Sequence, residues 1–389
     1  MFIRPEDQLE QLLGLTLEQL DIPHHLYLEA VDEYQAVGDW LCRRYEGGSH
    51  TGCEVYVQGS FRLGTVIRPI HNRDEYDLDL VCRRNLAKES ITQAGLKEDV
   101  GAGLADYEEA AAGSASAPTL KEGDRCWTLM YPSDRFHMDV LPAIPDAEGV
   151  PNSILLTDRS LRHWQHSNPI DYASWFHRRM RQEFLELREA LAKAQHRDVA
   201  EVPEWQVKTT LQRAVQTLKR HRDIHFQGNP KERPASIIIT TLAARAYRGG
   251  GNLYEVVADI ARRMPTLVER RNGVWWVPNP VHAEENFADR WRMHPERARR
   301  FFDWMEQVNT DLADLTAGRG FDRVIDKLAV SLGESPVREA AERVGAAMVK
   351  DRAAGRLTMA SGTGMLGIGA GTRVREHNFH GDPTPRRRP

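Results

Sequence analysis

Three aspartates stand in short apolar segments whose pattern is typical of β-strands. Asp77 and Asp79 are one residue apart, and side chains at i and i+2 of a strand point to the same face, so both carboxylates project together. Asp139 occupies the middle of a second such segment, 136–142. Like charges held this close are costly unless a cation lies between them, and carboxylate oxygens are the ligands that Mg²⁺ prefers. The three aspartates therefore predict a site for divalent metal ions.

A glycine and a serine precede the aspartates, directly after another predicted strand, 53–57. Gly59 lets the backbone approach a phosphate closely, and Ser60 adds a hydroxyl beside the exposed N–H groups. By itself a Gly-Ser pair is usually a turn, and a lone Asp-x-Asp is usually a solvated strand end. Here Asp77 follows Ser60 by seventeen residues, and the third aspartate comes about sixty residues later. This order favours in-line displacement at a phosphate, in which two Mg²⁺ ions activate the attacking hydroxyl and stabilise the leaving pyrophosphate.

The segments around these residues predict a mixed αβ region followed by a helical one. Two helices are expected within 5–46, and strands at 53–57, 77–82, 125–131 and 136–141. Further helices are expected at 170–195, 205–226, 236–247, 253–270, 295–315, 321–330 and 337–356. We therefore expect an α+β chain with three parts: a lobe at 1–165 with a mixed sheet and the N-terminal helices, a helical lobe at 166–358, and a flexible glycine-rich tail at 359–389.

Bulk composition sets further limits. The chain has 389 residues, of which 41% are hydrophobic and 28% charged, as in ordinary globular proteins. No apolar run approaches the roughly 18 residues of a membrane span, and the N-terminus lacks the pattern of a signal peptide. We therefore expect a cytoplasmic protein without membrane contact. The four cysteines form no CxxC pair and stand beside no histidine at ligand spacing, which predicts free thiols rather than zinc ligands or disulfides.

The charge balance bears on nucleic-acid binding. The formal net charge is −4, whereas proteins that grip duplex DNA usually carry a basic excess that neutralises phosphates. Local basic clusters such as 219–222 exist, but the chain as a whole does not have the composition of a DNA-binding platform. We expect no requirement for duplex DNA.

Several segments together resemble one known family. They are Gln58-Gly59-Ser60-Phe61-Arg62-Leu63-Gly64-Thr65, the strand 76–81, the segment 137–145 and, further on, 211–223 and 279–291. In this order they resemble the bacterial CD-NTases, relatives of cyclic GMP–AMP synthase in the polymerase-β-like nucleotidyltransferase superfamily. The resemblance implies a catalytic lobe and a helical lobe with the active site in the cleft between them. It also implies condensation of nucleoside triphosphates into a cyclic di- or trinucleotide second messenger of anti-phage signalling, with release of pyrophosphate.

The resemblance further implies a role for each site residue. Asp77 and Asp79 would bridge two Mg²⁺ ions, for which Mn²⁺ could substitute, and Asp139 would bind the ion that activates the acceptor hydroxyl. The residues expected to hold the nucleotide are Gln58, Gly59, Ser60, Thr65, Lys219 and Ser236. For the last two, a solvated lysine and a helix N-cap are the ordinary alternatives. The implied substrates are ATP and either GTP or a pyrimidine nucleoside triphosphate, with a regulatory protein as a further partner.

Other functions of the same fold stay open. Toxin-type nucleotidyltransferases modify tRNA or protein, and other members make linear oligonucleotides. A catalytically inactive binding module is a third class, but all three carboxylates are present. The zinc-binding His/Cys insertion of the vertebrate DNA sensor is missing, since no cysteine follows Cys126. Base choice, ring size and linkage depend on the shape of the pocket and cannot be read from these motifs.

Overall fold

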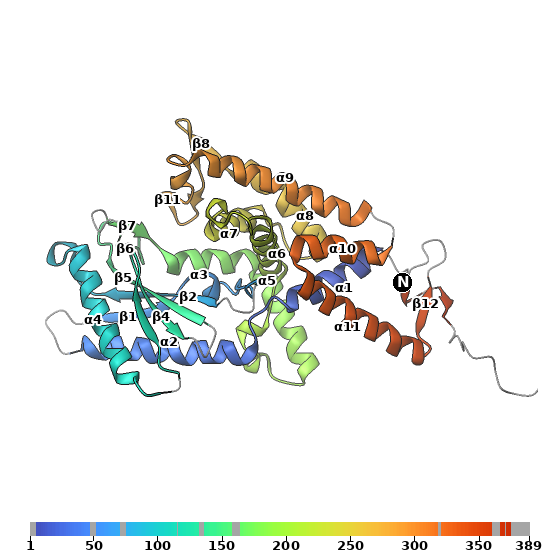
Figure 1. The fold of residues 1–389 in the computed structure, drawn as a ribbon, viewed down its shortest axis with the longest axis horizontal. Helices are drawn as coiled ribbons and strands as arrows, with labels where there is room; N and C mark the ends of the chain where they lie inside the picture. Colours follow the sequence, from blue (N-terminus) through green and yellow to red (C-terminus); the bar gives the residue numbers. More distant parts are fainter. Residues whose placement is uncertain are drawn as a thin grey trace, which may run out of the picture. The chain divides into compact units, whose positions relative to one another are not determined.

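A mixed β-sheet carries the three aspartates (Figure 1). Its strand order is β1-β2-β5-β4-β3, and β6 and β7 extend it beyond β5. The strands are β1 (Cys53–Val57), β2 (Tyr76–Arg84), β3 (Thr119–Glu122), β4 (Trp127–Tyr131), β5 (Phe136–Pro145), β6 (Ile154–Leu156) and β7 (Gln165–Ser167). β2 and β5 pair in parallel, and the other neighbours are antiparallel. The α+β class with a mixed sheet is confirmed.

Around the aspartates the two faces of the sheet have opposite character, as the alternating sequence predicts, whereas further along β2 and β5 the face that carries the aspartates is buried at Val81 and Leu141. On β2, Leu78 and Leu80 are buried, and on β5 Met138 is buried on the same side. They pack with α2 (His24–Arg44) and α4 (Gln93–Ala111), which cover this face (Figure 1). Burial of each leucine contributes roughly 1.5–3 kcal/mol. The alternate positions, which include all three aspartates, therefore face the other side of the sheet.

The structure, a computed structural model, describes residues 5–46, 52–70, 75–114, 116–131, 136–157, 164–317, 320–359, 366–369 and 371–374. They form two compact units, a larger one at Leu20–Thr310 and a smaller one that combines Met1–Gln19 with Asp311–Pro389. Within the described residues, no helix is both long and apolar enough to cross a membrane. The expected boundary at 165/166 lies inside the larger unit, so a division into two lobes at that point stays a prediction.

Helices make up most of the larger unit after the sheet. They are α5 (Pro169–Gln195), α6 (Thr210–His225), α7 (Ser236–Ala246), α8 (Leu253–Arg263) and the first part of α9 (Pro295–Ala317). The one-turn helix α3 (Gly59–Arg62) follows β1. Short 3₁₀ helices are η1 (Lys88–Ser90), η2 (Val199–Glu201), η3 (Glu204–Gln206), η4 (Pro230–Glu232), η5 (Met264–Leu267) and η6 (Asp289–Trp291). α6 begins later than expected because Thr209 and Gln212 form a capping box there.

Two hairpins replace the end of a predicted helix. The helix expected at 253–270 stops at Arg263, where Pro265 follows. The chain then forms β8 (Glu269–Arg271) with β9 (Val274–Trp276), and β10 (Pro278–Asn279) with β11 (His282–Asn286). Asn272 and Gly273 between β8 and β9 have φ of 49° and 82°, as a two-residue hairpin turn requires. The Asn-Gly pair is the signal that the helix prediction overlooked.

A buried polar face of α6, together with Lys208 just before the helix, holds the loop that follows α3. Five side-chain donors each bond one backbone carbonyl of residues 63–68. The pairs are Gln212 with Leu63 (2.9 Å), Lys208 with Gly64 (2.9 Å), Lys219 with Thr65 (2.9 Å), Gln216 with Val66 (2.8 Å) and Arg220 with Arg68 (2.7 Å). We call these five donors the α6 clamp. It joins the sheet-bearing and helical segments into one unit.

The clamp also explains why residue 64 is a glycine. Gly64 has a φ of 65°, and a Cβ there would lie 2.5 Å from Nε2 of Gln212. Any side chain would therefore be strained by the backbone and would displace a clamp residue.

The smaller unit contains α1 (Pro5–Glu18), α10 (Phe321–Leu332) and α11 (Glu334–Ala353), with α1 packed on α11. It ends in a sheet of order β13-β12-β14, formed by Leu366–Ile368, Leu357–Met359 and Thr372–Arg373. The described part of the expected tail therefore pairs with β12 and does not form a loose extension. Thr358 on β12 donates to the carbonyls of Gly367 and Gly369. Residues 375–389 of that expected tail lie outside the described residues.

The α6 clamp predicts a large cost for losing one of its amides. Gln216 is fully buried and donates to both the Val66 carbonyl and the Asp21 carboxylate. Gln216→Met should lower the free energy of unfolding by about 1–3 kcal/mol, because buried acceptors lose their donor. Urea denaturation followed by circular dichroism measures this. The matched control, Gln182→Met at an exposed site of α5, should change stability by less than about 0.5 kcal/mol. Equal effects of the two variants would show that the clamp bond contributes little.

Candidate active site

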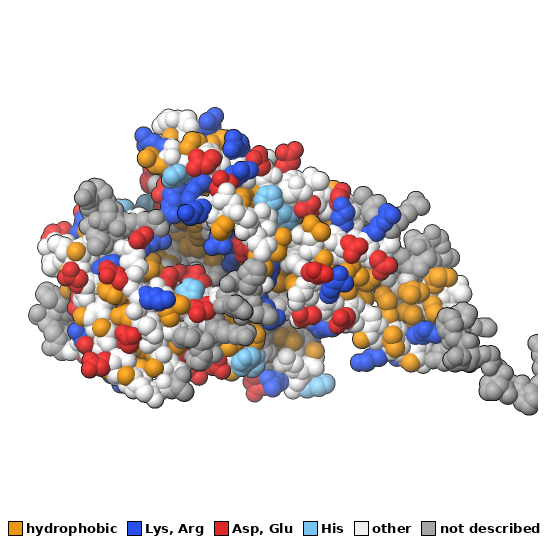
Figure 2. Space-filling view, viewed as in Figure 1, with side chains coloured by type: hydrophobic (Ala, Val, Ile, Leu, Met, Phe, Trp, Pro, Cys, Tyr) orange, Lys and Arg blue, Asp and Glu red, His pale blue; other side chains and the backbone are white. Residues whose placement is uncertain are grey.

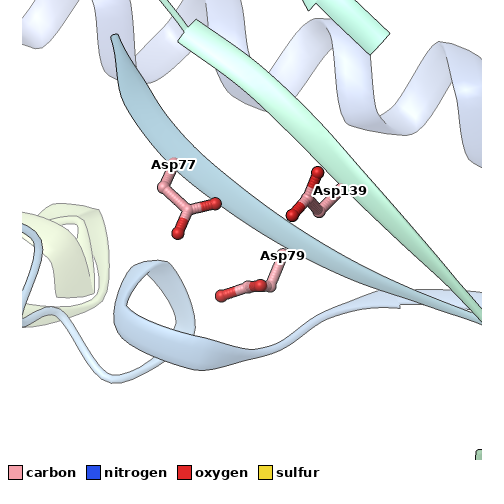
Figure 3. A group of neighbouring side chains, drawn as sticks. All are labelled: Asp77, Asp79 and Asp139. Atoms are coloured by element: carbon pink, nitrogen blue, oxygen red, sulfur yellow. The ribbon is translucent and has the colours of Figure 1, made fainter. Parts of the chain in front are cut away.

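The three aspartates converge on the open face of the sheet (Figure 3). The parallel register of β2 and β5 sets Asp79 opposite Asp139, and Asp77 lies two residues before Asp79 on β2. One carboxylate oxygen from each residue lies within 4.8 Å of the others. Three hard oxygen donors this close together fit a divalent cation. The structure thus brings together the residues that the spacing predicted for a metal site.

The environment of the cluster supports this fit. Burial, followed by the negative charges of Asp77 and Asp139, raises the pKa of Asp79 to about 7. Lys219 and Arg125 act in the opposite direction but do not offset it. A bound cation would reverse the balance, because positive charge favours the ionised carboxylate. The cluster therefore needs positive charge beyond that of the neighbouring lysine and arginine side chains, and a bound cation would supply it.

The turn after β1 lies directly against Asp79. The backbone N–H of Gln58 donates to the Asp79 carbonyl at 2.8 Å, which ties the start of the turn to β2. Gly59 follows with a φ of 63°, and a side chain there would overlap the Asp79 carboxylate. Ser60 continues into α3, and its carbonyl accepts from the Thr65 N–H at 2.9 Å. A glycine is therefore required where the backbone meets the acidic cluster.

A threonine that the sequence reasoning missed orients Asp139. Thr128 lies opposite Asp139 in the β4–β5 register, and its hydroxyl donates to Oδ1 of Asp139 at 2.5 Å. One carboxylate oxygen of Asp139 points toward Asp77 and Asp79 (Figure 3). The signal for Thr128 was its place among the alternating residues of strand 125–131, but the register between strands could not be derived from that pattern.

The predicted nucleotide-binding residues divide into two groups. Gln58, Gly59 and Ser236 line the cleft described below. Ser236 is the first residue of α7, and its hydroxyl accepts from Arg222 at 2.8 Å, so it is not an N-cap. Thr65 is instead buried within the loop 63–68, and its hydroxyl has no hydrogen-bond partner among the described residues.

Lys219 belongs to the second group. It is buried, and its amine donates to the Thr65 carbonyl. Burial, followed by the charge of Arg222, lowers the pKa of Lys219 to about 8, while the charges of Asp77 and Asp79 oppose this shift. Its field therefore reaches the acidic cluster, and the alternative of a solvated lysine does not hold. The direct phosphate contact expected for Lys219 stays a prediction.

A large cleft opens beside the Gly59 turn. Its volume is about 1360 Å³, above the roughly 300–1,000 Å³ of a pocket for one drug-sized ligand. It is lined by the turn, the start of α5 and of α7, and the strands β9–β11. Figure 2 shows a hollow in this face, with Lys and Arg side chains gathered above it and Asp, Glu and His side chains below. Such a cleft suits a polyanionic ligand and is larger than one ligand of that size needs.

Comparisons with known proteins agree with this geometry. The family model described as cyclic GMP–AMP synthase DncV-like, nucleotidyltransferase domain, matches residues 53–142. The c-di-GMP synthase of Roseivirga ehrenbergii is 29% identical over 378 residues, which cover 96% of this chain and 98% of that protein. The structure of Bradyrhizobium diazoefficiens CdnG in complex with GTP superposes with a TM-score of 0.70 at 22% identity, covering 87% of this chain and 100% of that chain. The E. coli CdnC:HORMA-deltaN complex gives 0.61 at 12% identity, covering 84% of this chain and 96% of that chain.

The fold, the paired and opposing aspartates and the adjoining Gly-Ser turn define a nucleotidyltransferase of the polymerase-β-like class. The matched domain contains β1, α3, β2 and Asp139 of β5, which are the elements that build the site. Over nearly its whole length the chain is similar to bacterial cyclic dinucleotide synthases, and its residues 53–142 match the DncV-like nucleotidyltransferase domain.

The raised pKa of Asp79 predicts a pH-dependent stability of the metal-free protein. The unfolded carboxyl titrates near pH ~3.9, so between about pH 4 and 7 the folded state holds more protons than the unfolded state, and stability falls as the pH rises. In EDTA, the Tm of the wild type should fall from pH 5 to pH 8 relative to Asp79→Asn. Mg²⁺ at pH 8 should raise the wild-type Tm and leave the variant nearly unchanged. The exposed Asp303→Asn is the control. Parallel Tm curves for wild type and Asp79→Asn would refute the assignment.

Asp139→Ala should separate chemistry from binding. We expect turnover to fall by about 10²–10⁴-fold, because the role predicted for this carboxylate is on the acceptor hydroxyl, and affinity for the triphosphate to change little. Single-turnover kinetics and equilibrium nucleotide binding measure the two effects. Ser60→Ala should instead raise the KM of the donor. If Asp139→Ala abolishes nucleotide affinity and leaves the turnover of bound substrate unchanged, the role predicted for Asp139 is wrong.

Proposed function

We propose that this protein is a CD-NTase that condenses two molecules of GTP into a cyclic dinucleotide. The observation that carries the proposal is the three-carboxylate cluster packed against the Gly59 turn, at the edge of a cleft larger than one nucleotide needs. Guanine is favoured because one relative over nearly the whole chain is a c-di-GMP synthase and the CdnG structure holds GTP. This narrows the base choice that the sequence left open.

In this proposal the chain's residues act on two nucleotides at once. Asp77 and Asp79 would hold two Mg²⁺ ions, or Mn²⁺ in their place, and Asp139 would hold one of them. When bound, the ions lower the pKa of the acceptor hydroxyl and neutralise charge on the leaving group. The backbone of Gly59 and the hydroxyl of Ser60 bind and orient the donor triphosphate.

The bond changes balance without a further reactant. The oxygen of an acceptor hydroxyl forms a bond to the α-phosphorus of the donor, and the bond from that phosphorus to pyrophosphate breaks. Asp139, held by Thr128, takes up the hydroxyl proton and passes it to solvent. The same groups serve a second time when the linear dinucleotide closes on itself, which releases a second pyrophosphate.

The family also suggests a setting for the product. A cyclic dinucleotide made in the cytoplasm, where nucleoside triphosphates are abundant, would act as a second messenger in anti-phage defence. CdnC has been solved in complex with HORMA-deltaN, and a regulatory protein partner is proposed here by analogy. The acidic balance of the chain, −4, supports activity without added nucleic acid.

Product analysis tests this function directly. Purified, nuclease-treated protein incubated with all four nucleoside triphosphates and Mg²⁺ should yield a cyclic dinucleotide in which both bases are guanine, identified by mass spectrometry. Asp77→Asn combined with Asp79→Asn should abolish it without unfolding the protein, since removing clustered like charges relieves repulsion. Activity that appears only with DNA or RNA, a linear end product, or label transferred to tRNA or protein would each contradict the proposal.

A further inference from the structure

We propose that three cations on the rim of the cleft form a second phosphate site, which binds the 5′-triphosphate of the acceptor nucleotide. They are Lys231, Arg292 and Arg297, and we call them the cationic rim. The proposal rests on the proposed function, because only an enzyme that joins two triphosphates needs two such sites.

Charge balance demands a separate place for the second triphosphate. The donor triphosphate would lie at the Gly59 turn, where metal ions offset its charge. The acceptor brings a second polyphosphate into the same cleft, beside three aspartates. Unpaired charge in a partly enclosed cleft is costly unless cations meet it. Cations other than those at the catalytic cluster must therefore accept it.

Most cations of the cleft already have partners. Arg62 donates to the Val57 carbonyl, Arg125 to Gln165, and Arg222 pairs with Asp223 and Ser236. Arg233 lies 3.7 Å from Asp223, and its charge also acts on Asp77, which places it toward the catalytic cluster.

The cationic rim differs from these residues. Its three side chains make no ion pair or hydrogen bond with any residue that the structure describes, yet all three line the cleft. Lys231 and Arg292 are exposed, and Arg297 is half-buried. Their charge is thus available to a ligand.

Neighbouring contacts bring Lys231 and Arg297 of the rim together. Glu232 of η4 pairs with Arg300 of α9 at 2.7 Å, which sets η4 beside the first turns of that helix. Arg297 lies one turn before Arg300, so it faces the same region as Lys231. The carboxylates of these segments are engaged, since Glu232 pairs with Arg300 and Glu296 with His294 at 3.3 Å.

The chemistry of the rim suits a polyphosphate. A guanidinium offers paired N–H donors that match phosphate oxygens, and a lysine adds a compact charge with three donors. Two arginines and a lysine can therefore meet several phosphate groups of one chain. Figure 2 shows Lys and Arg side chains gathered on one side of the hollow, across from its acidic side. An acceptor anchored there by its triphosphate would direct its sugar toward the aspartates.

Nucleotide analogues that can act only as donor or only as acceptor test the proposal. 2′,3′-Dideoxy-GTP has no acceptor hydroxyl and serves only as donor. Guanosine 5′-(α,β-methylene)triphosphate has no cleavable α–β bond and serves only as acceptor, and GMP is an acceptor without the triphosphate. In Lys231→Gln/Arg297→Gln we expect the KM of the methylene acceptor to rise about tenfold or more. The KM of GMP and that of the donor should change less than about twofold.

Two controls separate the rim from general charge. Arg299→Gln removes an exposed arginine of α9 that does not line the cleft, and it should leave all three constants unchanged. In EDTA, inorganic tripolyphosphate should bind the wild type more tightly than the double variant by calorimetry, and this readout does not depend on catalysis.

The outcomes are distinct. Equal effects on GMP and on the methylene acceptor, or unchanged tripolyphosphate binding, overturn the cationic rim as a phosphate site. A wild-type enzyme that makes no nucleotide product refutes the proposed function, and it is recognised before any variant is compared. Loss of donor affinity alone would assign the rim to the donor and overturn the acceptor role.

Discussion

The α6 clamp is the interaction on which the rest of the site depends. Residues 63–68 do not pair with any strand of the sheet, so their backbone carbonyls need other donors. A buried carbonyl without a donor costs free energy. Side chains of α6 and Lys208, which precedes the helix, supply those donors, although burying a charged lysine or arginine itself costs free energy. The arrangement holds the far end of the turn whose near end is bonded to Asp79. The Gly59 turn is therefore fixed at both ends relative to the carboxylates.

The fixed turn and strands also hold the three carboxylates close together, which creates electrostatic repulsion at the cluster. Three carboxylates within 4.8 Å repel one another, and Lys219, Arg125 and Arg233 reduce this without cancelling it. This repulsion destabilises the folded state. Burial of Leu78 and Leu80 on the apolar face of the sheet, beneath the aspartates, offsets that cost. A site that keeps its carboxylates close together before a cation binds needs such a rigid support.

Much of this architecture could be predicted because it follows from local pattern. The period-two alternation of β2 and β5 placed Leu78 in the core and all three aspartates on one face, and the structure brings them together. Long-range pairing could not be predicted in the same way. The contact of Thr128 with Asp139 depends on strand register, and the clamp depends on which carbonyls meet α6. The amphipathic rule even misleads here, since the polar stripe of α6 is buried.

The parallel pairing of β2 and β5 has a consequence for the chain as it is made. A parallel pair needs a crossover, here the segment with α4, β3 and β4, so the cluster cannot assemble until β5 has left the ribosome. The clamp closes a still larger loop, since Lys219 and Thr65 are 154 residues apart. Contacts of such high order form late. A nascent chain that ends before β5 therefore has no metal site, and one that ends before α6 has no fixed turn, so translation that stops this early cannot release an active enzyme.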